Sequence, residues 1–205
     1  MKNGLFITFE GIEGSGKSTQ IALLAEHLRN KGHEVTMTRE PGGTSIGSAI
    51  RRILLSPEFS EMNYHTEVLL YAADRAQHVA ELIRPALNRG SIVVSDRYID
   101  SSIAYQHFGR GLPLDLILEV NDRATQGLKP DITFLLVVPT ELGLGRATQL
   151  AADRIEQESI DFHNRVETGF QELAAREPER WLIVDGTRSV DEIHRVITEA
   201  VEALL

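Results

Sequence analysis

Cysteine is absent from this 205-residue sequence. Its absence excludes disulfides and thiolate metal sites, and it agrees with a reducing compartment, so we expect a cytoplasmic protein. Long apolar runs are also missing, since no stretch approaches the ~20 residues that a membrane-spanning helix needs. The first apolar run is interrupted by Glu10 and is too short for a secretory signal. We therefore expect no membrane partner.

Positive charge is scarce, because 21 Lys and Arg face 30 Asp and Glu, which gives a formal net charge of −9. This balance argues against a surface that coats nucleic acid, so we expect no nucleic-acid partner. The net charge does not exclude a locally basic pocket. Internal repeats and low-complexity linkers are absent as well, and we expect one domain over residues 1–205.

One short stretch carries the strongest functional signal. Residues 11–18 read GIEGSGKS and fit the phosphate-loop pattern G-x-x-x-x-G-K-[ST]. An apolar run at residues 5–10 predicts a strand before it, and the apolar spacing in residues 19–30 predicts a helix after it. In such a loop, glycines let backbone N–H groups face phosphate oxygens, and the helix N-terminus adds partial positive charge. The predicted ATP-binding residues are Gly11, Ile12, Glu13, Gly14, Ser15, Gly16, Lys17, Ser18 and Thr19.

Strand and helix patterns alternate along the rest of the chain. Further strands are expected at residues 34–38, 91–95, 132–138 and 181–184, and helices at about 46–54, 66–84, 113–126 and 190–204. We expect Pro85 to end the helix at 66–84, and Ser189 with Glu192 to form a capping box before the last helix. The alternation predicts an α/β fold, a doubly wound five-stranded parallel sheet flanked by helices.

An acidic residue and an arginine follow the expected strand at 91–95. Asp96 and Arg97 would lie at the sheet edge where such folds bind ligands. Asp96 could hold Mg²⁺ through water beside Ser18, and Arg97 could bind phosphate. Taken alone, a strand that ends in two solvated charges is the better interpretation. The phosphate loop reverses that preference.

Other polar residues fall where a second ligand would need them. Tyr71 and Arg75 are spaced i, i+4 on one helix and could stack a base and bind its edge. The alternative puts Tyr71 in the core and Arg75 at its rim. The remaining candidates for a polar pocket opposite the phosphate loop are Arg39, Glu40, Arg51, Ser102, Tyr105 and Gln106.

Five motifs together resemble bacterial thymidylate kinase, within the phosphate-loop nucleoside monophosphate kinases. They read FEGIEGSGKST, TREPGGT, YAADRAQH, SDRYIDSSIAYQ and DRIEQE, and they span nearly the whole chain in family order. The resemblance implies transfer of the γ-phosphoryl group of ATP to thymidine monophosphate, with Mg²⁺ as cofactor, for thymidine triphosphate synthesis. It also implies a homodimer.

The resemblance assigns roles to the acceptor-binding residues. Glu13 would lie near the sugar hydroxyl, and Glu40 beside the acceptor, next to a cis peptide bond at Pro41. Arg51 and Arg97 would hold the acceptor phosphate. Tyr71 would stack on thymine, at a position that is usually Phe. The base edge would be read by Arg75, Ser102 and Gln106, and Tyr105 would crowd the 2′ position and favour deoxyribose.

The chemistry requires charge neutralisation more than proton transfer. The acceptor phosphate has a second pKa near ~6 and is already an anion at neutral pH, so no general base is needed. Lys17, Arg97, Mg²⁺ and an arginine of a lid at about residues 143–157 would offset the charge. Residues 147–152 contain no Arg or Lys. We predict Arg154 as the transition-state arginine and Arg146 as second choice, with packing on adenine as its alternative role.

Three other functions stay open from the sequence. The chain could phosphorylate another nucleoside monophosphate, act as a nucleotide-dependent switch, or bind nucleotide without catalysis. A GTP-dependent switch would need an Asn-Lys-x-Asp motif, which is absent.

Overall fold

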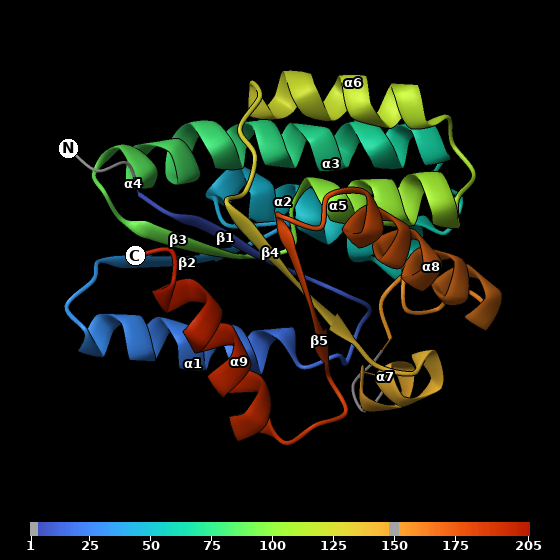
Figure 1. Cartoon of the computed structure of the whole chain (residues 1–205). Helices are drawn as coiled ribbons and strands as arrows, with labels where there is room; N and C mark the ends of the chain where they lie inside the picture. Colours follow the sequence, from blue (N-terminus) through green and yellow to red (C-terminus); the bar gives the residue numbers. More distant parts are fainter. Residues whose placement is uncertain (1–3, 148–151) are drawn as a thin grey trace.

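The computed structural model describes residues 4–147 and 152–205. Its five strands form one parallel sheet in the order β2-β3-β1-β4-β5, as predicted (Figure 1). The strands are β1 Phe6–Glu10, β2 Val35–Arg39, β3 Ile92–Asp96, β4 Ile132–Val137 and β5 Trp181–Asp185. Every residue of β1 is buried, because this strand lies at the centre of the sheet.

The register of the sheet brings the carboxyl ends of β1 and β3 together. Phe9 of β1 lies beside Asp96 of β3, so the phosphate loop and the turn at Arg97 leave the same edge. Arg39 of β2 is also paired in register with Asp96. The side chains that end these strands therefore converge without any long connection.

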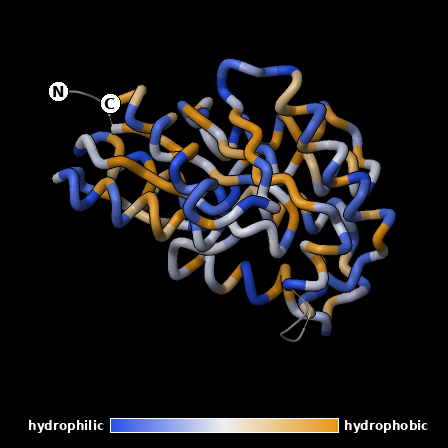
Figure 2. Tube along the Cα trace, turned by 60° about the horizontal axis from the view of Figure 1, so that its bottom comes forward, coloured by the Kyte–Doolittle hydropathy of each residue, from blue (hydrophilic) through white to orange (hydrophobic). Residues whose placement is uncertain are grey.

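Two helices cover one face of the sheet. They are α1 Lys17–Asn30 and α9 Val190–Glu202. The side chains of Ile7 and Phe9 both point toward these helices, because every second residue of a strand faces the same side of the sheet. They pack with Leu24 and Ile197 in one buried cluster. The predicted capping box of Ser189 and Glu192 is confirmed at the start of α9. Figure 2 shows the hydrophobic segments concentrated inside the molecule and hydrophilic residues along many of its outer turns.

The other helices cover the opposite face. They are α2 Ser45–Leu55, α3 Tyr64–His78, α4 Arg84–Asn88, α5 Ile99–Ser102, α6 Leu114–Thr125 and α8 Ile160–Arg176, with a short 3₁₀ helix η1 Pro57–Phe59 and the π-helical segments η2 Val79–Ile83 and η3 Ile103–Gly109. Helix α7 Thr140–Ala147 follows β4 at the carboxyl edge of the sheet (Figure 1). Among the described residues, no helix is both long and apolar enough to cross a membrane.

The prediction that Pro85 ends a helix was wrong. The helical path of α3 continues through η2 into α4, which carries Pro85 in its first turn. Proline lacks an N–H and clashes with the carbonyl four residues earlier in a regular α-helix. The π-helical turn just before Pro85 is wider, so the proline ring does not meet the carbonyl that it would clash with in a regular α-helix. A proline is also tolerated in the first turn of a new α-helical segment.

Candidate active site

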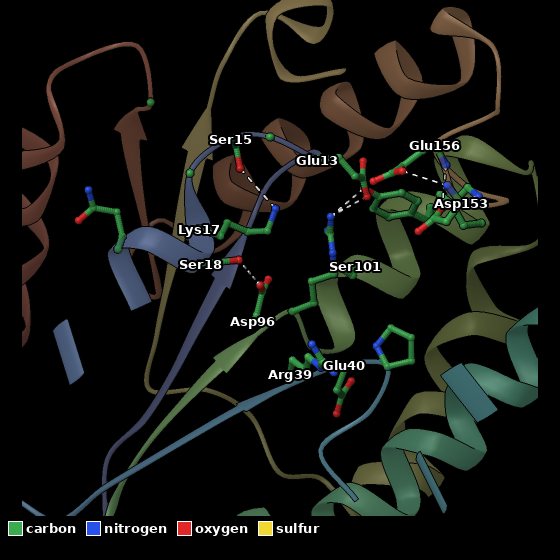
Figure 3. A pocket seen from close by; sticks show the side chains of 18 of the residues that line it. Glu13, Ser15, Lys17, Ser18, Arg39, Glu40, Asp96, Ser101, Asp153 and Glu156 are labelled. Atoms are coloured by element: carbon green, nitrogen blue, oxygen red, sulfur yellow. Dashed lines mark hydrogen bonds and ion pairs between the residues drawn. The ribbon is translucent and has the colours of Figure 1, made fainter. Parts of the chain in front are cut away.

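A pocket with a volume of about 680 Å³ opens at the carboxyl edge of the sheet. The phosphate loop forms one wall, and residues of β2, α2, α3 and the segment from Asp96 to Gln106 form the opposite wall (Figure 3). Nearly all predicted site residues line this one cavity. The pocket also takes in Gly186 and Arg188, which follow β5 at the same edge.

The phosphate loop has the backbone that its glycines predict. Gly11, Gly14 and Gly16 all have positive φ angles, of 131°, 68° and 98°. Lys17 donates from Nζ to the carbonyl oxygens of Gly11 and Ile12, at 2.9 and 2.8 Å. Burial and the charge of Arg97 lower the pKa of Lys17 to about 8 against the opposing pull of nearby carboxylates. These two carbonyls hold the amine inside the loop.

The loop also makes close contact with α7. A Cβ on Gly14 would lie 2.0 Å from the carbonyl oxygen of Gly143, and one on Gly143 would lie 2.6 Å from the carbonyl oxygen of Glu13. Arg146, one turn further along α7, donates from Nη1 to the carbonyl of Gly14 at 3.4 Å and lines the pocket. Two glycines thus allow the approach that brings Arg146 to the phosphate loop.

Ser18 and Asp96 form the candidate metal site. The Ser18 hydroxyl donates to Oδ2 of Asp96 at 3.2 Å, while Oδ1 of Asp96 is buried without a hydrogen-bond partner among the described residues. A hydroxyl and an unpartnered carboxylate oxygen suit Mg²⁺, which prefers oxygen ligands and keeps several waters. No group of three or more carboxylate or imidazole ligands occurs in the described part of the chain.

The backbone at Arg97 takes an unusual conformation that a buried acid supports. Arg97 has a φ of +72°, in the left-handed region. Glu10 accepts from the Tyr98 N–H at 2.8 Å and from the Ser101 hydroxyl at 2.5 Å, which fixes the chain just beyond Arg97. Burial and the charge of Asp100 raise the pKa of Glu10 to about 8, with Arg97 opposing the rise.

The Arg97 side chain lies in the middle of the pocket wall. Its Nη2 donates to Oε1 of Glu13 at 2.8 Å and to the Tyr105 hydroxyl at 3.1 Å. The Tyr105 hydroxyl donates to Glu13 in turn, at 2.8 Å from its Oε1. One polar group beside the phosphate loop therefore joins Glu13 to two residues far along the chain, Arg97 and Tyr105.

A second, more deeply buried group surrounds Arg75. Arginine has five N–H donors. They reach Oε2 of Glu40 at 2.7 Å, the Ser102 hydroxyl at 2.9 Å, the carbonyl of Tyr98 at 3.0 Å, and Oδ1 of Asn121. One N–H on Nη2 is left over among the described contacts. The cis peptide bond between Glu40 and Pro41 is confirmed.

The remaining acceptor candidates line the same wall. Arg51 donates from Nη1 to the carbonyl of Pro41 at 3.0 Å, and Tyr71 is half-buried on α3. Gln106 donates from Nε2 to Oε1 of Glu67 at 3.0 Å. Sequence reasoning missed Glu67 and Asn121, because neither belongs to a recognisable motif and each acts through a residue far along the chain.

The two lid arginines occupy different places. Arg154 is buried, donates from Nε to the carbonyl of Leu54 at 2.8 Å, and has Nη2 2.6 Å from Oε2 of Glu67 without hydrogen-bond alignment. The pocket is lined by its neighbours Asp153, Ile155 and Glu156. Residues 148–151, within the predicted lid and the Arg- and Lys-free stretch, lie outside the described residues.

Comparison with known proteins decides the family. The model of the family described as thymidylate kinase matches residues 9–197 of this chain. The chain belongs to the thymidylate kinase family. The thymidylate kinase of Halothermothrix orenii is 52% identical over 206 residues, covering 98% of each chain. That of Sulfurihydrogenibium sp. is 48% identical over 199 residues, covering 97% of each.

A solved structure agrees with this family at the level of the whole fold. The crystal structure of the thymidylate kinase from Ehrlichia chaffeensis has a TM-score of 0.81 and 33% identity, and the match covers 97% of this chain and 99% of that one. The family resemblance inferred from the five motifs is therefore confirmed. Family membership supports ATP-dependent phosphorylation of thymidine monophosphate as the activity of this chain.

Proposed function

We propose that this chain transfers the γ-phosphoryl group of ATP to thymidine monophosphate, giving ADP and thymidine diphosphate. One observation carries the proposal: a single cavity joins the phosphate loop to the polar groups around Arg97 and Arg75. Two nucleotides could therefore meet with their phosphates between the two walls. Membership of the thymidylate kinase family supports the same activity.

The donor nucleotide would occupy the phosphate-loop side. Backbone N–H groups of the loop and the N-terminus of α1 would bind the ATP phosphates, and Lys17 would exchange its carbonyl partners for phosphate oxygens. Ser18 and Asp96 would hold Mg²⁺, whose chemistry is to offset the charge of the phosphates. Gly186 and Arg188, after β5, are the lining residues best situated for the rest of ATP.

The acceptor nucleotide would occupy the opposite wall. Arg51 and Arg97 would bind its phosphate, Glu13 and Tyr105 would lie at the sugar, and Tyr71 would stack on the base. No general base is needed because the acceptor phosphate is already an anion. The residues hold and align two anions, and they supply the positive charge that lets the anions approach.

The contacts favour Arg146 over Arg154 as the lid arginine that acts on the transferring group, which reverses the order expected from sequence. Arg146 lines the cavity beside the phosphate loop, while Arg154 is paired with Glu67 behind the wall. Moving Arg154 into the cavity would leave the buried carboxylate of Glu67 with one arginine fewer. That cost opposes a catalytic role.

The test is ADP formation with ATP and Mg²⁺ against a panel of nucleoside monophosphates. Strong preference for thymidine monophosphate is expected. Turnover with a different acceptor would keep the phosphate loop but overturn the base-reading roles. If ATP binds and no acceptor is phosphorylated, the catalytic proposal fails.

The assembly and location of the chain are further proposals. Exposed apolar side chains on the packed pair α2 and α3, namely Ile46, Ile53 and Leu69, support a homodimer. Sedimentation of the purified protein would test it, and a monomer at all concentrations would contradict it. The lack of cysteine supports the cytoplasm as the compartment.

A further inference from the structure

Gln106 contacts a carboxylate, and this contact restricts how its amide can face the pocket. Its Nε2 donates to Oε1 of Glu67 at 3.0 Å. An ionised carboxylate only accepts hydrogen bonds, so it cannot pair with the amide oxygen. The NH₂ group must therefore point to Glu67. No donor among the described residues reaches Oε1 of Gln106, and the residue lines the cavity.

Glu67 is held in its ionised form by arginines. Arg110 donates to both of its oxygens, at 3.2 and 3.1 Å, and Arg154 lies 2.6 Å from Oε2. Burial alone would raise the pKa of Glu67, but the arginines outweigh it and hold the pKa below its usual range. The acceptor-only character of Glu67 is thus maintained at neutral pH.

Arg75 supplies the opposite hydrogen-bonding character on the same wall. It can only donate, and one N–H on Nη2 is left over after its contacts with Glu40, Ser102, Asn121 and Tyr98. Arg75 and Gln106 therefore present one donor and one acceptor on this wall. A base with a carbonyl at position 4 and an N–H at position 3, such as thymine or uracil, matches this pair. Cytosine has an amino group at position 4 and a bare nitrogen at position 3, the reverse pattern.

We propose that Glu67 is a specificity-determining positioning residue, which sets the amide of Gln106 so that the pocket accepts thymine or uracil and rejects cytosine. The inference rests on the proposed function, because it concerns the acceptor of that reaction. Glu67 does not touch the base. It acts by fixing which atom of Gln106 does.

The decisive variant is Glu67→Gln. Two guanidinium groups lie at Oε2 and one, that of Arg110, also reaches Oε1, so the new amide should keep its oxygen at Oε2 and turn its NH₂ toward Gln106. Gln106 would then present its own NH₂ to the base. The ratio of kcat/KM for thymidine monophosphate over deoxycytidine monophosphate should fall by about tenfold or more. The ratio over deoxyuridine monophosphate should not change, since uracil and thymine share the same edge.

Arg110→Lys is the matched control. It removes the guanidinium from the same buried cluster but keeps the positive charge that holds Glu67 ionised, so both ratios should stay at wild-type values. An unchanged cytosine ratio in Glu67→Gln, or an equal fall in Arg110→Lys, would overturn the proposal. Failure of the proposed function would appear differently, as a wild-type protein that prefers another acceptor.

The wild-type protein gives a second test in case Glu67→Gln does not fold. The side-chain NH₂ signal of Gln106 in a nitrogen-15 NMR spectrum can be assigned by its loss in Gln106→Leu. Its protons should exchange slowly with solvent both before and after thymidine monophosphate is added, because Glu67 retains them. If the NH₂ turned from Glu67 to the nucleotide on binding, its protons would lose their protection from exchange. That result would contradict the proposal.

Discussion

The two walls of the pocket are built in different ways. The phosphate-loop wall consists mostly of backbone from one short segment, and the hydrogen bonds that the Lys17 amine makes with described residues all go to that segment. The opposite wall consists of side chains from several segments, and Arg75 of α3 joins Glu40, which follows β2, to Ser102 of α5 and Asn121 of α6. The first wall depends on local conformation and the second on tertiary contacts. Changes in the first should mainly alter chemistry, and changes in the second should also alter stability.

Lys17→Ala should have the largest effect on activity and little effect on folding. Loss of the amine removes positive charge at the transferring phosphoryl group, so turnover should fall by about 10³-fold or more. Steady-state kinetics and a urea unfolding curve would measure both effects. Lys31→Ala, which breaks an exposed pair with Glu202, should leave turnover unchanged. Near-normal turnover in folded Lys17→Ala would contradict the phosphate-loop assignment.

Arg75→Ala, in the opposite wall, should lower both the stability of the protein and its affinity for the acceptor. It leaves the buried carboxylate of Glu40 without its guanidinium partner, which should cost about 3–5 kcal/mol of unfolding free energy. The KM for thymidine monophosphate should rise as well. Arg123→Ala breaks an exposed pair with Glu119 and serves as control, with almost no change in either quantity. An Arg75→Ala protein of wild-type stability would remove the contrast between the walls.

The lid arginines extend the same comparison. Arg146→Ala should lower kcat by about 10²–10³-fold with stability unchanged, because Arg146 lies on the phosphate-loop wall. Arg154→Ala should instead lower the urea midpoint, because it leaves Glu67 with one buried partner fewer. Each variant is the control for the other. If Arg154→Ala loses more kcat than Arg146→Ala, the original order from sequence was right.

Glu10 gives an effect on stability that is visible only as a pH dependence. Its pKa is about 8 in the folded protein, against a usual value of 4.5. The folded state therefore keeps a proton that the unfolded state loses, and stability falls as pH rises between these values, by up to about 1.4 kcal/mol per pH unit. Glu10→Gln mimics the protonated acid and should flatten this slope in urea unfolding curves. An equal slope in both proteins would contradict the shifted pKa.

Sequence patterns predicted the local wall better than the tertiary one. The phosphate loop and five strands follow from short-range rules, so residues 11–18 and the sheet could be predicted directly. Helix α8 could have been found from Phe162, Val166 and Phe170, which recur at helical spacing. The continuation past Pro85 could not, because it depends on a π-helical turn.

The choice between the lid arginines shows the limit more clearly. Arg146 and Arg154 both lie in the predicted lid, and no periodicity separates them. Their positions differ because Arg154 pairs with Glu67 on a distant helix, while the close approach of Gly14 to Gly143 brings Arg146 to the phosphate loop. The same holds for the roles of Glu67 and Asn121, whose partners are known only once the chain has folded.

Arg97 shows that the conformation of the backbone and the contacts of the side chain can favour different residues at one position. A left-handed backbone costs most L-residues roughly 1–2 kcal/mol, and glycine avoids this cost. Arg97→Gly would relieve that strain at a φ of +72°, but it would also leave Glu13 without the guanidinium that lies 2.8 Å away. An engineer who ranks substitutions by backbone conformation alone would choose that change and would lose an ion pair in the wall of the pocket.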